Sequence, residues 1–365
     1  MLTQQSRIHA FVFLLLLTLA APVVSDTVPC STLRDRIIVP LRLNHLGPYY
    51  FVLDAGIDTP VLNAMFVDSL SFATKTEGNL RYMEGPHFLA HDTLHFEFNH
   101  LGVLDLSRLD ATLGQKVAGL FPLYQPGYEV TVDVASQQIH WVPLGKDTLQ
   151  PDSPGVVPIR VDKNKTATVD VVLATDFTRP CILDLHLSES ASLHQATLLK
   201  LNLEKSPNST QLPNGDTIKT IAVPELKIDS MVLAPAWCRI VPDTAKERLG
   251  MAFLKRCAFT LNYEAGLARF APLAGHAEVG AAPSAHGIAL STYTRPYWSL
   301  ALLQESPAAK AGVLPGDQLM EVQGMSMSGA SYKQVAYALQ QPYTDALQLQ
   351  LRRDGETLGI QIPPG

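Results

Sequence analysis

The chain has 365 residues, of which 47% are hydrophobic and 17% charged, and its formal net charge is −6. This length predicts two or three domains, and the composition is that of a globular protein rather than a disordered one. The acidic balance, without a basic run anywhere, argues against nucleic acid and anionic membrane surfaces as the main partners. The 26 prolines and 23 glycines include many turn-forming pairs, so we expect many short strands.

The first residues have the layout of a secretory signal. Arg7 precedes an apolar run from Ala10 to Ala21, and Pro22 follows it. The run is too short and too terminal for a spanning helix, and no later stretch is apolar enough to cross a bilayer. We therefore expect residues 1–25 to be a signal peptide. The mature chain would be secreted or periplasmic, without an integral membrane segment.

The cysteines allow more than one arrangement. The four of them are Cys30, Cys181, Cys238 and Cys257. In an oxidising compartment they allow up to two disulfides, and the sequence leaves three pairings open. Because no Cys-x-x-Cys pair occurs, neither a zinc knuckle nor a thiol redox motif is indicated.

One pattern of strand, aspartate and glycine occurs twice along the chain. An apolar strand ends at Asp54, and another ends at Asp184. Each aspartate is followed, after nearly the same number of residues, by an apolar segment around Gly119 or Gly250. Such a period indicates a duplicated structural unit. Two copies with one carboxylate each would bring two carboxylates together at a pseudo-two-fold axis.

The repeat, and a change in texture after it, define the expected domains. Both copies contain short apolar segments separated by turn residues, so we predict two mostly β lobes, with a short helix at 191–203. A linker rich in Ala, Gly and Pro follows the second copy. The expected boundaries are 26–145 for lobe 1, 154–273 for lobe 2, 274–285 for the linker and 286–365 for a C-terminal module.

The C-terminal module has its own local signals. Ser331 and Gln334 have the spacing of a helix N-cap with reciprocal bonding, which predicts a helix to about Gln341. An alternating segment then leads to a hairpin turn at Asp354-Gly355. Residues 306–319 read Ser-Pro-Ala-Ala-Lys-Ala-Gly-Val-Leu-Pro-Gly-Asp-Gln-Leu. This run resembles the corresponding part of bacterial PDZ domains.

By that resemblance, the module would hold the C-terminus of an extended peptide. The implied carboxylate-binding loop consists of His286, Gly287, Ile288 and Ala289. On the helix, Val335 and Leu339 would face the peptide. Binding of this kind is β-augmentation, in which the peptide adds a strand to an open sheet edge. The alternative is that the two helix residues are core residues of an amphipathic helix.

The two copies resemble the lobes of pepsin-like and retropepsin-like aspartic proteases. The match lies in the strand that ends at Leu53-Asp54-Ala55-Gly56 and in the segment Leu249-Gly250-Met251, and it spans about residues 31–273. With the last module, the chain resembles bacterial two-lobed aspartic-protease-like proteins with a C-terminal PDZ domain. The resemblance implies Asp54 and Asp184 as the catalytic pair, polypeptide as the substrate, and no metal or cofactor.

The chain departs from the family pattern beside both aspartates. The residue after each aspartate carries a hydroxyl in the family, whereas this chain has Ala55 and Leu185. The next residue is glycine in the family; Gly56 keeps it, and His186 does not. Two hypotheses follow. The chain is either an aspartic-type endopeptidase or a catalytically inactive pseudoprotease that acts as a peptide-binding scaffold.

A group of histidines suggests a metal site at first sight. His87, His91 and His95 are evenly spaced, which would place them on one face of a continuous strand. The Gly85-Pro86 pair and the polar residues between them argue against one continuous strand. We therefore expect solvated or hydrogen-bonded histidines and no metal. The same stretch, near residues 82–86, is the expected position of a protease flap.

Overall fold

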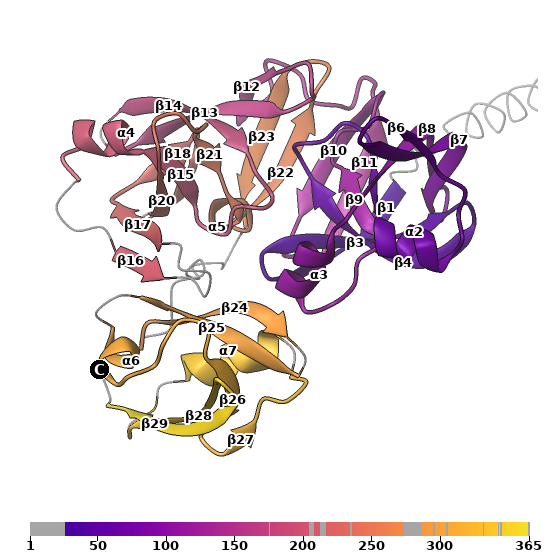
Figure 1. Cartoon of the computed structure of the whole chain (residues 1–365). Helices are drawn as coiled ribbons and strands as arrows, with labels where there is room; N and C mark the ends of the chain where they lie inside the picture. Colours follow the sequence, from indigo (N-terminus) through magenta and orange to yellow (C-terminus); the bar gives the residue numbers. More distant parts are fainter. Residues whose placement is uncertain are drawn as a thin grey trace, which may run out of the picture.

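The structure is a computed structural model of the chain (Figure 1). It describes residues 26–174, 176–203, 208–211, 217–233, 236–273, 286–294, 296–303, 306–330, 332–341, 343 and 345–363. The expected signal peptide and linker lie outside the described residues. Strands contain 52% of the residues and helices 11%, which confirms the prediction of a mostly β protein.

Lobe 1 is built around an eight-stranded sheet with the order β2-β3-β4-β9-β5-β8-β7-β6. Its strands are β2 (Ser31–Leu33), β3 (Arg36–Leu43), β4 (Leu46–Asp54), β5 (Val61–Asn63), β6 (Lys75–Glu77), β7 (Leu80–His91), β8 (Leu94–Leu104) and β9 (Gly119–Pro122), and its helices are α2 (Ala64–Ser69) and α3 (Ser107–Leu113). Ile37, Val39 and Leu41 alternate along β3 and are fully buried in the main core. Because alternate residues of a strand point to the same face, this spacing places one face of β3 on the core.

Lobe 2 consists of shorter strands and two short helices. Its strands are β12 (Val156–Val161), β13 (Ala167–Leu173), β14 (Phe177–Leu183), β15 (Ala191–His194), β16 (Asn208–Gln211), β17 (Thr217–Val223), β18 (Leu226–Ile228), β19 (Met231–Leu233), β20 (Ala236–Val241), β21 (Arg248–Leu249), β22 (Cys257–Asn262) and β23 (Leu267–Pro272), with helices α4 (Gln195–Lys200) and α5 (Met251–Leu254). The helix expected at 191–203 is wrong in its first part. Residues 191–194 form β15 because they pair with both β20 and β21, and only α4 is helical.

Strand pairing continues from one lobe into the other. Strands β1 (Asp26–Pro29), β11 (Gln138–Pro143) and β10 (Tyr128–Asp133) of lobe 1 are paired in this order. β10 then pairs with β22 of lobe 2, with Val130 opposite Leu261, and β23 and β12 follow. Both lobes also share one cluster of buried apolar residues. The lobes are therefore fixed to each other by backbone hydrogen bonds as well as by packing.

The pairings around the repeated pattern are the same in both lobes. In lobe 1, β9 pairs parallel with β4 and antiparallel with β5. In lobe 2, β21 pairs parallel with β14 and antiparallel with β15. Gly119 begins β9 and Gly250 directly follows β21. A Cβ added to Gly119 would lie 2.1 Å from the Val61 carbonyl oxygen, and one added to Gly250 would lie 2.2 Å from that of Glu189. Only glycine permits this close approach.

The C-terminal domain has its own apolar core, separate from that of the lobes. Its elements are β24 (Ile288–Thr294), β25 (Tyr297–Leu303), α6 (Pro307–Lys310), β26 (Gln318–Val322), β27 (Met325–Ser326), α7 (Tyr332–Gln340), β28 (Leu347–Arg353) and β29 (Glu356–Ile362). Helix α7 and the β28–β29 hairpin confirm the two local predictions, although Ser331 lies outside the described residues. Strand β16 of lobe 2 pairs with β25, so backbone pairing attaches this domain to lobe 2.

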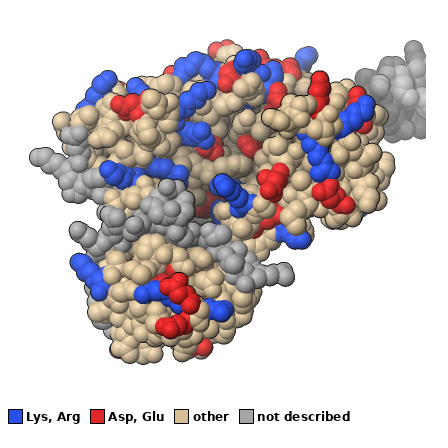
Figure 2. Space-filling model, in the orientation of Figure 1, with Lys and Arg blue, Asp and Glu red and all other residues tan. Residues whose placement is uncertain are grey.

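The four cysteines, Cys30, Cys181, Cys238 and Cys257, are free and buried, and none of the disulfides that the sequence allowed is present. Burial raises the pKa of the Cys30 thiol to about 11, and the charge of Asp133 acts in the same direction. No helix within the described ranges is long and apolar enough to span a membrane. Basic and acidic side chains are intermixed over the face in Figure 2.

We expect Gly119→Ala to lower the free energy of unfolding by about 1–3 kcal/mol, because backbone atoms of β5 must move to admit the methyl group. Urea unfolding followed by tryptophan fluorescence measures this change. Gly359→Ala is the matched control, since no atom lies within 4 Å of an added Cβ there. Equal loss of stability in the two variants would contradict the close approach at Gly119.

Candidate functional site

Asp54 is the last residue of β4, and the loop after it fixes its carboxylate. The Gly56 N–H donates to Asp54 Oδ1 over 2.7 Å, and the Leu123 N–H donates to the Asp54 carbonyl oxygen over 2.8 Å. The strand before it is anchored by the fully buried Phe51 and Leu53. The Asp54 side chain is 16% exposed. The backbone therefore holds this carboxylate at one place near the protein interior.

Asp184 directly follows β14 and has a closely similar setting. The His186 N–H donates to Asp184 Oδ1 over 2.7 Å, and the Asp184 N–H donates to the Leu249 carbonyl oxygen over 2.9 Å. The Asp184 side chain is 14% exposed. Each aspartate thus accepts a hydrogen bond from the N–H two residues later. Each also lies beside the segment in which a glycine closely approaches the backbone of its lobe, at Gly119 or Gly250.

His186 contacts both aspartates. Its backbone N–H contacts Asp184, and its ring atom Nδ1 lies 3.8 Å from Asp54 Oδ2. The structure therefore places both sequence-predicted carboxylates at the same residue. Where the family pattern has glycine, an imidazole lies beside the Asp54 carboxylate.

Two arginines that sequence reasoning missed complete the site. Arg248 Nη1 donates to Asp184 Oδ2 over 2.7 Å. Arg36 Nη1 donates to the His186 carbonyl oxygen, across the boundary between the lobes. Arg248 had a visible signal, since it is a charged residue next to the apolar-Gly segment at Gly250. Arg36 had none, because its partner lies 150 residues away.

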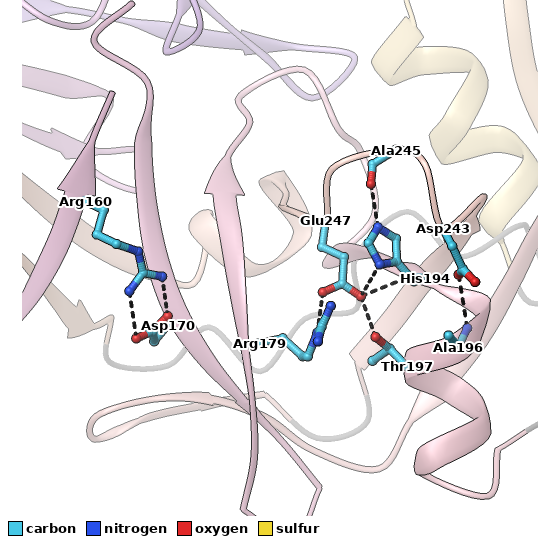
Figure 3. Close-up of polar contacts among 9 residues, drawn as sticks. All are labelled: Arg160, Asp170, Arg179, His194, Ala196, Thr197, Asp243, Ala245 and Glu247. Atoms are coloured by element: carbon cyan, nitrogen blue, oxygen red, sulfur yellow. Dashed lines mark hydrogen bonds and ion pairs between the residues drawn. The ribbon is translucent and has the colours of Figure 1, made fainter. Parts of the chain in front are cut away.

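A buried network holds the strand that carries Arg248 (Figure 3). Glu247 is the preceding residue, and its side chain is 1% exposed. Its carboxylate accepts from Arg179 Nε over 2.6 Å, from Thr197 Oγ1 over 2.7 Å and from the His194 N–H over 2.9 Å. A buried carboxylate with this many donors is well satisfied. The network therefore fixes the position of β21 and, with it, the start of the Arg248 side chain.

Burial and charge act in opposite directions on the histidine. Burial lowers the pKa of the His186 imidazole, the charge of Asp54 raises it, Arg36 lowers it and Asp184 raises it. Burial also lowers the pKa of the Arg36 guanidinium, against the charges of the nearby aspartates. Burial raises the pKa of the Tyr263 hydroxyl, and Asp54 adds to this effect. The net effect lowers the pKa of the His186 imidazole, which favours its neutral form at neutral pH.

The other predicted loop residues are apolar and buried. Ala55 is 2% and Leu185 is 1% exposed, and both belong to the main core. Neither supplies a hydroxyl donor. The loops are held instead by the carboxylate-to-N–H bonds of the two aspartates and by the ion pair with Arg248.

The predicted peptide-binding residues lie in the C-terminal domain. His286 is buried, its carbonyl oxygen accepts from the Ala308 N–H over 3.1 Å, and Gly287 has a φ of +75°. Ile288 and Ala289 begin β24, and Ile288 is buried in the domain core. Val335 and Leu339 on α7 belong to the same core and are 0% and 3% exposed.

The histidines do not form a metal site in the part of the chain that the structure describes, where no group of three or more potential ligands is found. His87 and His91 lie on β7, whereas His95 lies on β8, beyond the turn at Asp92. His87 Nδ1 is within 3.1 Å of Asn44 Nδ2. The segment expected to be a flap lies on β7, and its Gly85-Pro86 pair coincides with an irregularity in the β7–β8 register.

Comparisons with known proteins give the following similarities. The chain is similar to a retropepsin-like aspartic protease from Rickettsia conorii, with 15% identity over 32% of this chain and 89% of that one and a TM-score of 0.26. It is also similar to an aspartic proteinase from Irpex lacteus, with 9% identity over 70% of this chain and 99% of that one and a TM-score of 0.45. No protein-family model matches the sequence, and a search of curated proteins finds no match.

We expect stability to fall as the pH is lowered from about 6.5, in part because of His186. Its pKa is lower in the folded than in the unfolded chain, where a histidine titrates near 6.5, so the unfolded state binds the extra proton first. His87 contributes in the same direction through its own burial.

The measurement is urea unfolding at pH 7.5 and pH 5.5. His186→Asn should show a smaller loss of stability between these two pH values than the wild type. His95→Asn, at an exposed position on β8, should behave as the wild type. An identical loss in the wild type and His186→Asn would show that the imidazole is not held in its neutral form.

Proposed function

We propose that this chain is an aspartic-peptidase-like protein that binds extended polypeptide without hydrolysing it. The observation that carries the proposal is the pairing of both candidate catalytic carboxylates with basic side chains. Asp184 is bonded to Arg248, and Asp54 faces the His186 imidazole.

Peptide hydrolysis by two aspartates needs a shared proton. In an active pair, the two carboxylates lie close enough that only one ionises. The protonated carboxylate acts as the acid, and the other activates water. Here Asp184 is bonded to Arg248, and the His186 ring lies beside Asp54. Each carboxylate thus has a basic partner, an arrangement that differs from a pair of aspartates sharing one proton.

The loop residues support the same conclusion. In the family that this chain resembles, the hydroxyl after each aspartate links the two loops, and Ala55 and Leu185 cannot do so. The His186 ring occupies space beside Asp54, where an attacking water would have to lie. Catalytic geometry tolerates displacements of only about half an ångström, so these changes remove the preorganisation that the reaction requires.

Polypeptide is the ligand that the architecture favours. The equivalent pairings around Gly119 and Gly250 support two lobes related by duplication, with the aspartates between them. The C-terminal domain resembles a PDZ module, and its strand β24 presents an edge to which a peptide can add a strand. The apolar segment at 10–21 supports secretion or a periplasmic location.

One observation favours hydrolysis as a second candidate. Both carboxylates contact the same residue, Asp184 at the His186 N–H and Asp54 at its ring, and a catalytic pair requires two aspartates near each other. An acidic solution that protonates one aspartate and weakens the pairing with Arg248 would favour this chemistry.

We expect no cleavage of a reduced, unfolded protein substrate between pH 3 and pH 8 by the wild-type chain, because Ala55 and Leu185 cannot link the two loops and the His186 ring lies beside Asp54. Product peptides are measured by mass spectrometry, and Asp54→Asn and Asp184→Asn are assayed in parallel. Cleavage by the wild type that disappears in both variants would establish the second candidate and refute the first.

A further inference from the structure

One two-residue turn of lobe 1 contacts both other parts of the molecule. Arg34 and Asp35 join β2 to β3, with φ values of 47° and 60°, between the paired residues Leu33 and Arg36. Such a turn favours asparagine and glycine, because other residues are disfavoured at positive φ. Aspartate tolerates this conformation, but the long Arg34 is not explained by the needs of the hairpin itself. We call residues 34–36 the junction turn.

Each residue of the junction turn has a different partner. Arg36 donates to the His186 carbonyl oxygen at the candidate site, and Asp35 is paired with Lys255 of lobe 2. Arg34 Nη1 donates to the Thr112 carbonyl oxygen in α3 over 2.5 Å. Arg34 Nη2 donates to the Leu290 carbonyl oxygen in β24. The Arg34 guanidinium also lies 4.7 Å from the centre of the Trp298 ring.

The Leu290 carbonyl belongs to the free edge of β24. Leu290 is paired with Leu300 in β25. The Leu300 N–H donates to Asp317, and its carbonyl accepts from Gly316, so both groups point away from β24. In an antiparallel pair, the two opposite residues either bond to each other or both point outward. The N–H and C=O of Leu290 therefore point to the side of β24 that has no strand partner among the described residues.

This edge is where an added strand would bind, and lobe 1 covers it. Helix α3 lies beside β24 (Figure 1). Arg34 uses the carbonyl that an incoming peptide N–H would use. On the far side of the hairpin, β16 of lobe 2 pairs with β25. The C-terminal domain is thus held by lobe 2 at one strand, and lobe 1 closes the opposite edge.

We propose that the junction turn is a gate: Arg34 occludes the peptide-binding edge of β24, and a bound extended peptide displaces it and thereby disturbs the Arg36–His186 contact at the candidate site. This inference rests on the proposed function, since it takes β24 to be an edge that binds polypeptide. It adds a coupling between that edge and the aspartates, carried by three consecutive residues.

The test compares the full-length wild type with Arg34→Ala. The control is Arg42→Ala, which removes an exposed arginine from β3, the strand that follows the turn containing Arg34. The first measurement is hydrogen exchange of the segments 286–294 and 183–190. We expect faster exchange of both segments in Arg34→Ala and no change in Arg42→Ala. Unchanged exchange of 286–294 would overturn the gate, and unchanged exchange of 183–190 would overturn the coupling.

The second measurement is binding of both proteins to an array of decapeptides with free C-termini. We expect Arg34→Ala to bind the recognised decapeptides about tenfold more tightly, since they no longer compete with one charge-assisted hydrogen bond. Arg34→Lys, which keeps the charge but loses the planar fork, should be intermediate.

The outcomes separate the two proposals. Equal affinity of the wild type and Arg34→Ala for the same decapeptides would overturn the gate and leave the peptide-binding function standing. Binding to neither protein, together with faster exchange in Arg34→Ala, would refute peptide binding at this edge and the gate with it. If Arg34→Ala fails to fold, Arg34→Lys decides by the same two measurements.

Discussion

The proposed lack of catalysis depends on the ion pair between Arg248 and Asp184. Its geometry comes from strand pairing: β21 runs parallel to β14, with Arg248 in register with Ile182, and Asp184 follows two residues later. The buried Glu247 network keeps this register. The strand register therefore determines which basic side chain meets the Asp184 carboxylate.

The aspartates have a structural role that does not depend on catalysis. Each accepts a hydrogen bond from the N–H two residues later, and this bond shapes the loop after its strand. The neighbouring Ala55 and Leu185 are buried in the core, where a hydroxyl without a partner would be costly. Apolar residues at 55 and 185 are therefore compatible with both carboxylates. These aspartates shape their loops whether or not the chain hydrolyses peptides.

The residues of the candidate site that the sequence singles out have a local or periodic signature. Asp54, Asp184 and the glycines at 119 and 250 stand out because a strand followed by an aspartate, and then a glycine segment, occurs twice, and the structure gives the two copies similar backbone settings. The arginines were missed for a physical reason. Arg36 and Arg248 lie on strands, where a charged residue usually faces solvent, and only the three-dimensional arrangement shows their partners. The helix expected at 191–203 failed in its first part because pairing with two strands outweighed local preference.

The attachment of the C-terminal domain is unequal on its two sides. Strand β16 holds β25 by backbone pairing, with Thr210 opposite Leu303 and Gln211 opposite Leu302. Lobe 1 holds β24 through the contacts of one arginine and the flank of a short helix. A hydrogen bond from a charged donor contributes about 1.5–3 kcal/mol and a cation–π contact about 0.5–2 kcal/mol, and both are weakened when water can enter. Because the same turn also contacts His186, the contacts with β24 and with the candidate site are made by covalently linked residues. A movement of the C-terminal domain that breaks the Arg34 contact would therefore act directly on the turn that carries Arg36.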